Sequence, residues 1–198
     1  MPSSARRLGA AAALAVLAGC QSIPPPLPAA APWEVRRPQL QARQHFVLQG
    51  RVAVANGSQG FNANLYWIED GARAQLILAG PLGAGSVHIT ASGTDLSIDT
   101  PQGQHLENEA ARAEVSARLG FDPPLASLHY WVLGVPDPGA PATEVLDPAQ
   151  QRLQQLTQSG WRVDYGAYGA FGAESLPVRL SLQREALRVR LLVDDWHL

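Results

Sequence analysis

The sequence predicts a mainly β protein with a few short helices, and three observations lead to this fold class. Apolar and polar residues alternate with period two through most of the chain, a pattern typical of strands that bury one face. Turn sequences such as Asn56-Gly57 and Glu69-Asp70-Gly71 separate the alternating stretches, so neighbouring strands should pair antiparallel. The 198 residues include 18 glycines and 16 prolines, which favours many turns over long helices. A chain of this length has room for one domain with its own hydrophobic core.

Two long strands begin the predicted sheet. Apolar residues alternate from Phe46 to Val54 in the first strand and from Phe61 to Trp67 in the second. Short links join the later alternating stretches, as expected for hairpins. These further strands are expected at residues 72–79, 86–91, 96–100, 104–107, 161–168, 177–184 and 187–194.

Two short helices should interrupt the sheet. Residues 108–119 can form a helix that Asn108 caps and Gly120 ends. A second helix can span 122–133, starting with an Asp-Pro pair and stopping at Gly134. The second helix is amphipathic. Its apolar face carries Leu125, Leu128, Trp131 and Val132.

Residues 147–157 fit two structures. Asp147-Pro148 resembles a helix start, whereas 152–157 lead into Ser159-Gly160 like one strand of a hairpin. We favour the hairpin, which gives a sheet of about ten strands, and a sheet of that size tends to curl. Helices over the apolar face of a curled sheet leave either a solid core or a lidded cavity, and the pattern fits both.

The amino terminus resembles a bacterial lipoprotein signal. Arg6-Arg7 precede an apolar run, 8–19, that is too short to span a bilayer but long enough for a secretory signal. The run ends in Leu17-Ala18-Gly19-Cys20, a lipobox in which Cys20 receives diacylglycerol on its sulfur. The alternative is an ordinary signal peptide that happens to contain a cysteine. Residue 21 is Gln, and the resemblance to Gram-negative lipoproteins implies that only an aspartate there would favour the inner membrane. We therefore expect anchoring through Cys20 at the periplasmic face of the outer membrane.

Three segments follow from this interpretation. Residues 1–19 are the signal peptide, 20–40 the lipidated cysteine with a tether, and 41–198 the folded domain. From Gln21 to Pro38 the chain is rich in proline and alanine, a composition that favours extended polyproline II rather than a packed structure.

Charge and motifs argue against several classes of protein. All 15 basic residues are arginine, the net charge is -2, and no basic block is present, so nucleic acid is not an expected partner. The sequence has no P-loop, no Gly-x-Ser-x-Gly and no His-Glu-x-x-His, and its single cysteine forms no internal disulfide. The histidines stand apart, and Asp194-Asp195 is interpreted as solvated charge. We expect no catalytic residue, no metal and no cofactor.

Several segments resemble, in order, the LolB family of outer-membrane lipoprotein receptors. The two most specific are Pro81-Leu82-Gly83 and Trp131-Val132-Leu133-Gly134. The resembling segments are 46–54, 80–83, 124–134, 160–165 and 195–196. The resemblance implies an incomplete antiparallel β-barrel of about ten or eleven strands, with a helical lid over a hydrophobic cavity. It also implies that the protein accepts acylated lipoproteins from the periplasmic carrier LolA and inserts them in the outer membrane.

Two other functions stay open from the residues alone. A lipoprotein could hold a small lipid or other apolar ligand without passing on protein cargo. A periplasmic hydrolase would need a nucleophile beside a base, and the nearest pair, Ser127 and His129, is spaced i and i+2 on a helix, where the two side chains do not face each other. For the receptor we expect a monomer whose partners are the LolA-like carrier, its cargo and outer-membrane lipid.

Two sets of site residues are expected besides Cys20. Large apolar side chains on the alternating faces should line the acyl-chain cavity. These are Trp67, Leu76, Leu78, Ile89, Ile98, Trp131, Leu180 and Leu191. The loop at Pro81, Leu82 and Gly83 carries one large aliphatic residue among glycines, and the resemblance implies that this leucine protrudes toward the membrane and is needed for delivery.

Overall fold

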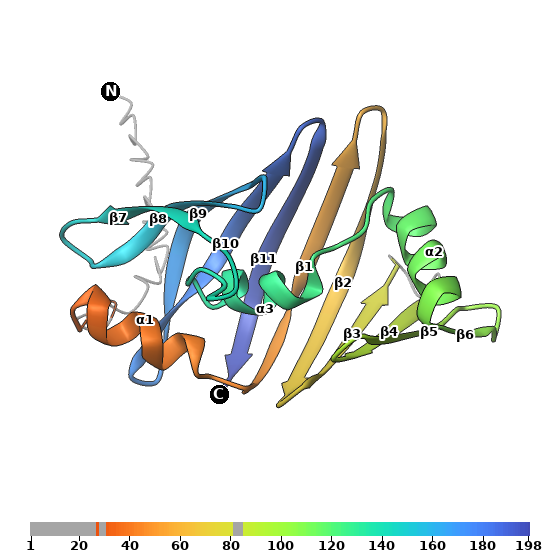
Figure 1. Cartoon of the computed structure of the whole chain (residues 1–198), viewed down its shortest axis with the longest axis horizontal. Helices are drawn as coiled ribbons and strands as arrows, with labels where there is room; N and C mark the ends of the chain where they lie inside the picture. The colour runs from red at the N-terminus through yellow and green to blue at the C-terminus, as the bar shows by residue number, and fades with distance from the viewer. Residues whose placement is uncertain (1–26, 28–30, 81–84) are drawn as a thin grey trace, which may run out of the picture.

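The computed structural model describes residues 27, 31–80 and 85–198, which form an open, curved antiparallel sheet with helices across its concave face (Figure 1). The sheet has eleven strands in the order β6-β5-β4-β3-β2-β1-β11-β10-β9-β8-β7. Strands β6 and β7 are its two edges, so the barrel is incomplete. The expected Cys20, Pro81, Leu82 and Gly83 lie outside the described residues.

The first and last strands of the chain pair at the centre of the sheet, where β1 lies between β2 and β11. The strands are β1 (His45–Asn56), β2 (Gln59–Asp70), β3 (Arg73–Ala79), β4 (Ser86–Ser92), β5 (Asp95–Asp99), β6 (His105–Glu107), β7 (Ala142–Asp147), β8 (Arg152–Gln158), β9 (Trp161–Phe171), β10 (Glu174–Arg184) and β11 (Leu187–His197). The hairpin favoured for residues 147–157 is confirmed, because β8 pairs with both β7 and β9.

Register brings the large apolar residues onto one face. Leu48 in β1 lies opposite Trp67 in β2 and opposite Trp196 in β11. Phe46 packs between these two indoles, with ring centroids 5.7 Å from Trp67 and 5.3 Å from Trp196. Gly50 is required at the register shift between β1 and β11, since a Cβ there would clash with the Leu192 carbonyl oxygen. The concave face is thus the apolar one.

The two expected helices form, with differences at their starts. Helix α2 (Asn108–Leu119) ends at Gly120, whose φ of 76° is the left-handed conformation that glycine adopts readily. The predicted cap was wrong, because Asn108 Oδ1 accepts a hydrogen bond from the Leu96 N–H and so ties the helix to β5. Helix α3 (Leu125–Val132) begins three residues later than predicted, since a residue before a proline disfavours the α conformation and prolines occupy positions 123 and 124.

The tether prediction was wrong beyond residue 32. Helix α1 (Trp33–Gln41) forms there and packs against strands of the second half of the sheet. Trp33 and Leu40 are buried, and the Trp33 Nε1–H donates a 2.8 Å hydrogen bond to Glu144. Arg36 donates to the carbonyl oxygens of Gln151 and Ser175. These specific contacts stabilise a helix where composition favoured an extended chain, and desolvation lowers the pKa of Arg36.

Candidate functional site

An apolar pocket lies between the concave face and the helices that cover it. Its volume is about 90 Å³, and no polar atom lines it. Strands β1, β2, β3, β4, β10 and β11 contribute its floor. Its cover comprises Leu119, Phe121, Pro123, Leu125, Leu128 and Val132.

A second pocket of about 350 Å³ adjoins the first beside helix α2. The two pockets share Phe61, Leu78, Ile89 and Leu119 in their linings. The second pocket is more open, and Arg118 and Asn62 are among its lining residues. The shared residues make the two pockets direct neighbours on the concave face.

Pocket size shows that the described conformation is closed. Binding sites for ligands the size of a drug molecule have volumes of about 300–1,000 Å³. The covered pocket, at about 90 Å³, is smaller than this range. An acyl chain fits this pocket only if part of its cover moves away from the sheet.

The structure brings six of the eight expected cavity residues to these pockets. Trp67, Leu76, Leu78, Ile89 and Leu191 line the covered pocket. Ile98 lines the adjoining pocket. The other two lie outside both: Trp131 is fully buried 6.2 Å from the Trp161 ring, and Leu180 is buried in β10 at the edge of a hollow on the outer face. Contact of these residues with acyl chains stays a prediction.

Helix α3 is fixed to three strands of the sheet. The Trp131 Nε1–H donates a 2.8 Å hydrogen bond to the Gln158 side chain in β8. The Tyr165 hydroxyl in β9 donates to the Trp131 carbonyl oxygen at 3.0 Å. Burial raises the pKa of Tyr165 well above 10.0, so this hydroxyl keeps its proton and remains a donor. His129 Nδ1 lies 3.2 Å from the Glu69 carboxylate in β2. Helix α3 therefore bridges the two halves of the sheet.

Glu69 is a buried carboxylate that joins the helix to the pocket floor. Its Oε2 accepts a 2.8 Å hydrogen bond from the Trp67 Nε1–H, and its Oε1 faces His129. The side-chain exposures of His129 and Glu69 are 12% and 8%. A carboxylate this well buried needs such partners. The pair therefore fixes both the Trp67 indole and the orientation of α3.

Helix α2 has fewer buried attachments. Of its residues only Ala111 and Val115 are buried. The Asn56 side chain donates a 3.1 Å hydrogen bond to the carbonyl oxygen of Gly120, at the surface. The Arg112 guanidinium donates to the Thr94 carbonyl oxygen, also at the surface. Because these two hydrogen bonds lie at the surface, whereas those that hold Trp131 of α3 are buried, α2 is easier to displace than α3.

Several pocket residues were absent from the predicted cavity set. Leu182 and Val189 line the covered pocket and follow the same period-two pattern as Leu180 and Leu191, so the pattern could have found them. Phe121 lies in the irregular connection between α2 and α3, where no periodicity marks it. The Glu69 and His129 pair joins residues far apart in the sequence, and no local signal indicated it.

The described residues offer neither a metal site nor a membrane-spanning helix. Within 27, 31–80 and 85–198, no three or more histidine, cysteine, aspartate or glutamate side chains gather to hold a metal ion. No helix in the same ranges is long and apolar enough to cross a membrane.

The open curved sheet and the wholly apolar pocket beneath its helices define a half-barrel carrier of apolar ligands. Residues 44–196 match the family model described as outer membrane lipoprotein LolB. The chain therefore belongs to the LolB family. Membership confirms the predicted family, the predicted localisation as an outer-membrane lipoprotein and the predicted role in lipoprotein transport.

Two relatives show how much of the chain the family likeness covers. The outer-membrane lipoprotein LolB of Nitrosococcus oceani is 31% identical over 188 residues, which cover 93% of this chain and 94% of that protein. The LolB of an Azoarcus species is 35% identical over 153 residues, which cover 77% of this chain and 78% of that protein. The likeness thus extends over most of the chain.

Solved structures support the fold independently. A LolA superfamily protein from Nitrosomonas europaea matches with a TM-score of 0.55 at 9% identity and covers 85% of this chain and 94% of that one. A DUF1329 family protein from Desulfovibrio piger matches with a TM-score of 0.55 at 8% identity and covers 87% and 93%. At such identities the likeness shows the fold alone, and the predicted incomplete antiparallel barrel is confirmed.

Proposed function

We propose that this chain receives acylated lipoproteins from a LolA-type periplasmic carrier and holds their acyl chains between the concave face and helices α2 and α3. It then passes them to the outer membrane. The observation that carries the proposal is the wholly apolar lining of the covered pocket. Removal of each acyl methylene from water is worth about 0.8 kcal/mol. A lining without polar atoms offers nothing to a charged or polar ligand and suits acyl chains.

The pocket opens by displacement of α2 and the connection at 120–124. Helix α3 is held by buried hydrogen bonds to β8 and β9 and by the Glu69 pair in β2. Leu119 at the end of α2 and Phe121 in the connection form the rest of the cover. The hydrogen bond from Asn56 to Gly120, which holds this part of the cover to β1, is exposed. Movement of this cover enlarges the covered pocket and joins it fully to the one beside α2.

Transfer needs no chemical step, and the receptor is not an enzyme. Handing acyl chains from one apolar cavity to another nearly cancels the cost of exposing them to water, and a difference of about 1.4 kcal/mol in affinity gives roughly a tenfold bias in direction. The hydrolase alternative gains no support from the geometry. The Ser127 hydroxyl donates a 2.7 Å hydrogen bond to Asp137, and His129 faces Glu69.

The anchor and the tether complete the proposal. Cys20 carries the lipid that holds the receptor, as a monomer, at the periplasmic face of the outer membrane, and the segment before α1 is the spacer. Three acyl chains would anchor the protein firmly, because even one chain alone gives marginal binding.

Replacement of the anchor separates localisation from uptake. A mature chain with Cys20→Ala should be released from the membrane and still accept a labelled lipoprotein from the loaded carrier, because the pocket lies entirely in the folded domain. Co-purification of label with this chain measures uptake. Loss of uptake with an unchanged unfolding midpoint would show that Cys20 has another role. Retention of small lipids without any protein cargo would favour the alternative of a simple lipid-binding lipoprotein.

A charge in the pocket should abolish acyl binding. Leu78 is only partly buried and lines both pockets, so Leu78→Glu should reduce cargo uptake about tenfold or more while water entering the adjoining pocket limits the stability loss. Ile77→Glu is the matched control, because Ile77 is the neighbouring residue on the opposite face of β3.

A second comparison separates pocket wall from packed core. Leu180 is only 1% exposed and lines neither the covered pocket nor the pocket beside α2. Leu180→Ala should therefore cost about 2–5 kcal/mol of stability. Leu78→Ala should cost less, since an existing pocket borders the side chain. Denaturant unfolding measures both values. Equal losses of stability would place Leu78 in a solid core and contradict its assignment to the acyl site.

A further inference from the structure

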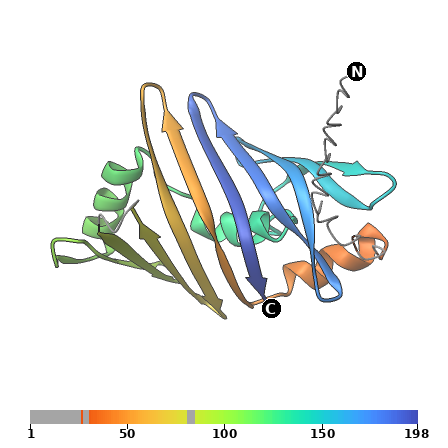
Figure 2. The same cartoon turned by 180° about the vertical axis from the view of Figure 1, so that it is seen from behind.

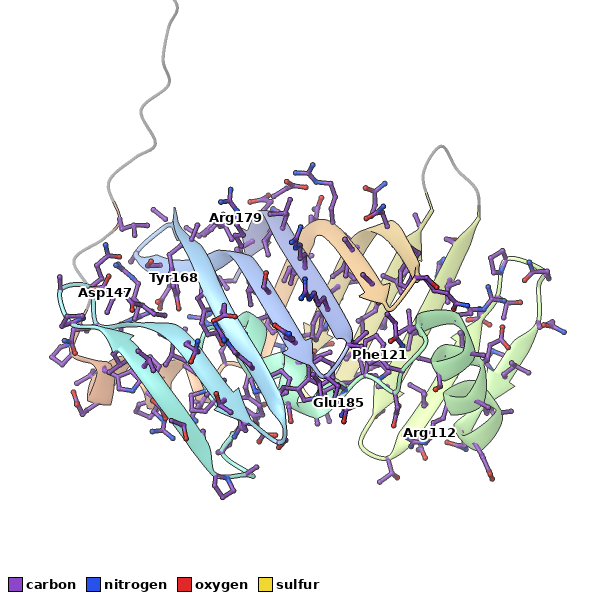
Figure 3. All side chains as sticks on the ribbon, turned by 90° about the horizontal axis from the view of Figure 1, so that it is seen from above. Arg112, Phe121, Asp147, Tyr168, Arg179 and Glu185 are labelled. Carbon is purple, nitrogen blue, oxygen red and sulfur yellow. The ribbon has the colours of Figure 1, made fainter. Side chains whose placement is uncertain are left out.

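The face of the sheet opposite α2 and α3 carries an open hollow of about 700 Å³. It lies over the central strands β1, β2, β10 and β11, which no helix covers when the molecule is seen from behind (Figure 2). Its polar lining comprises Arg51, Asn62, Asn64, Arg179, Ser181 and Arg190. In Figure 3, Arg179 lies on the side of the sheet away from Arg112 of helix α2. The hollow therefore opens on the other face of the sheet from the cover of the acyl pocket, although Asn62 borders both the hollow and the pocket beside α2.

Register brings its three arginines together. Arg51 in β1 lies opposite Leu192 in β11, and Leu192 lies opposite Arg179 in β10. Arg190 occupies the next outward position of β11, opposite Ser181. The Arg179 side chain lies against Gly166, where a Cβ would come within 3.2 Å of it. Three guanidinium groups from neighbouring strands thus border one hollow.

The positive charge of this surface is only partly neutralised. Asp194 accepts two hydrogen bonds from Arg51, at 2.7 and 3.2 Å, and so balances that residue. Another carboxylate on this face, Asp164 opposite Ser181, is paired with Arg162 at 3.0 Å. Within the described part of the chain, no acidic partner is found for Arg179 or Arg190. A cationic surface remains on a chain whose net charge is -2.

The donor groups suit phosphate. A guanidinium group presents a planar fork of N–H donors that matches phosphate oxygens, and it does so better than a lysine ammonium. The amide side chains of Asn62 and Asn64 add neutral donors at the same hollow. Leu192 lies between Arg51 and Arg179 and is 37% exposed, so the surface also offers an apolar contact. A lipid headgroup layer supplies both phosphate and apolar surface.

The hollow also reaches the end of β3. Asn64, which lines the hollow, pairs with Ala79, the last residue of β3, and Leu82 follows three residues later in the sequence. Anchoring through Cys20 would keep the domain near the outer membrane.

We propose that this hollow binds the phosphate groups of anionic phospholipid headgroups and docks the outer face of the sheet on the membrane. The inference rests on the membrane anchoring in the proposed function, but not on cargo transfer. Docking by this face leaves α2, α3 and the acyl pocket turned toward the periplasm, where a loaded carrier arrives. One face of the sheet then holds the membrane while the other receives cargo.

Vesicle binding tests the proposal with the mature Cys20→Ala chain, which has no lipid of its own. The chain should sediment with vesicles of equimolar phosphatidylcholine and phosphatidylglycerol and not with phosphatidylcholine alone. Each arginine near an anionic surface contributes about fivefold to binding, so Arg179→Gln should weaken it about fivefold and the Arg179→Gln/Arg190→Gln pair about 30-fold. Both residues are exposed, so the unfolding midpoint and cargo uptake should not change.

Arg112→Gln is the matched control. Arg112 is exposed in helix α2, on the side of the sheet away from Arg179 (Figure 3). It removes the same charge from the face turned away from the membrane and should change vesicle binding less than about twofold. Equal losses of vesicle binding for Arg112→Gln and Arg179→Gln, or equal binding to neutral and anionic vesicles, would overturn the proposal. Displacement from vesicles by millimolar inorganic phosphate would assign the site to free phosphate. Loss of carrier binding instead of vesicle binding would assign it to an acidic protein surface.

Discussion

A variant with Asn56→Cys and Gly120→Cys should lose about tenfold or more of its cargo uptake when the two cysteines are oxidised, and regain it on reduction. A Cβ at Gly120 would lie 3.9 Å from the Asn56 Cβ, within the range of about 3.5–4.5 Å found in disulfides. The bond would fix the junction of α2 and the 120–124 connection to the β1–β2 turn. Since the covered pocket holds only about 90 Å³, a receptor locked in this state leaves the acyl chains only the adjoining pocket of about 350 Å³.

The single variants provide the controls. Gly120 has a φ of 76°, so a cysteine there is strained by about 1 kcal/mol in the single and the double variant alike. Gly120→Cys alone, treated with the same oxidant, therefore carries the strain without the link. All variants contain Cys20→Ala so that no other thiol is present. Full uptake by the oxidised double variant would show that α2 does not open the site, and α3 would become the element to test.

The division of labour between the helices explains their different attachments. In helix α3, the carbonyl oxygen and the indole N–H of Trp131 both take part in buried hydrogen bonds. His129 of the same helix pairs with Glu69. Such buried bonds are costly to break, because each leaves an unsatisfied polar group. Helix α2 presents mainly side-chain contacts at the surface, where water replaces a broken bond. A receptor built this way keeps its pocket floor and part of its cover in place while the remaining cover moves.

Period-two alternation predicted the concave face well, because each strand has one buried side and the pattern reports it directly. Trp67, Leu76 and Leu191 were expected at the pocket for this reason, and the structure places them there. The glycine at 120 likewise predicted the end of α2 through its left-handed conformation. Local chemistry was sufficient in these cases, since the feature depends on residues close together in the sequence.

Features that depend on contacts between distant residues could not be predicted in this way. Helix α1 forms in a proline-rich segment because Trp33 bonds to β7, and Arg36 bonds to the turn between β7 and β8 and to β10. Trp131 was expected in the cavity wall, but its Nε1–H donates to Gln158 and draws the ring into the core. Pocket volume is a further example, since it depends on how closely the side chains from α2, α3 and the sheet pack together.

Substitution of Leu82 should separate the two halves of the transport reaction. Leu82→Glu should leave the fold and cargo uptake nearly unchanged and block transfer into the membrane, so that loaded receptor accumulates. Residues 80–85 connect the neighbouring strands β3 and β4, and neither Gly80 nor Gly85 lines the covered pocket. A change at Leu82 is therefore expected to have little effect on the covered pocket.

The size of the expected effect follows from the energy of one leucine. Entry of a single leucine side chain into a bilayer contributes about 1.5–3 kcal/mol, too little to anchor a protein but enough to bias the docking of one already tethered. A glutamate loses this contribution and adds the cost of moving a charge toward lipid, so delivery should fall by about tenfold or more.

Val145→Glu is the control, because Val145 is 45% exposed in the edge strand β7, in the other half of the sheet. One labelled lipoprotein, followed from carrier to receptor and from receptor to vesicles, measures both steps. Normal delivery by Leu82→Glu, or an equal loss of uptake and delivery, would remove the case for a dedicated insertion loop.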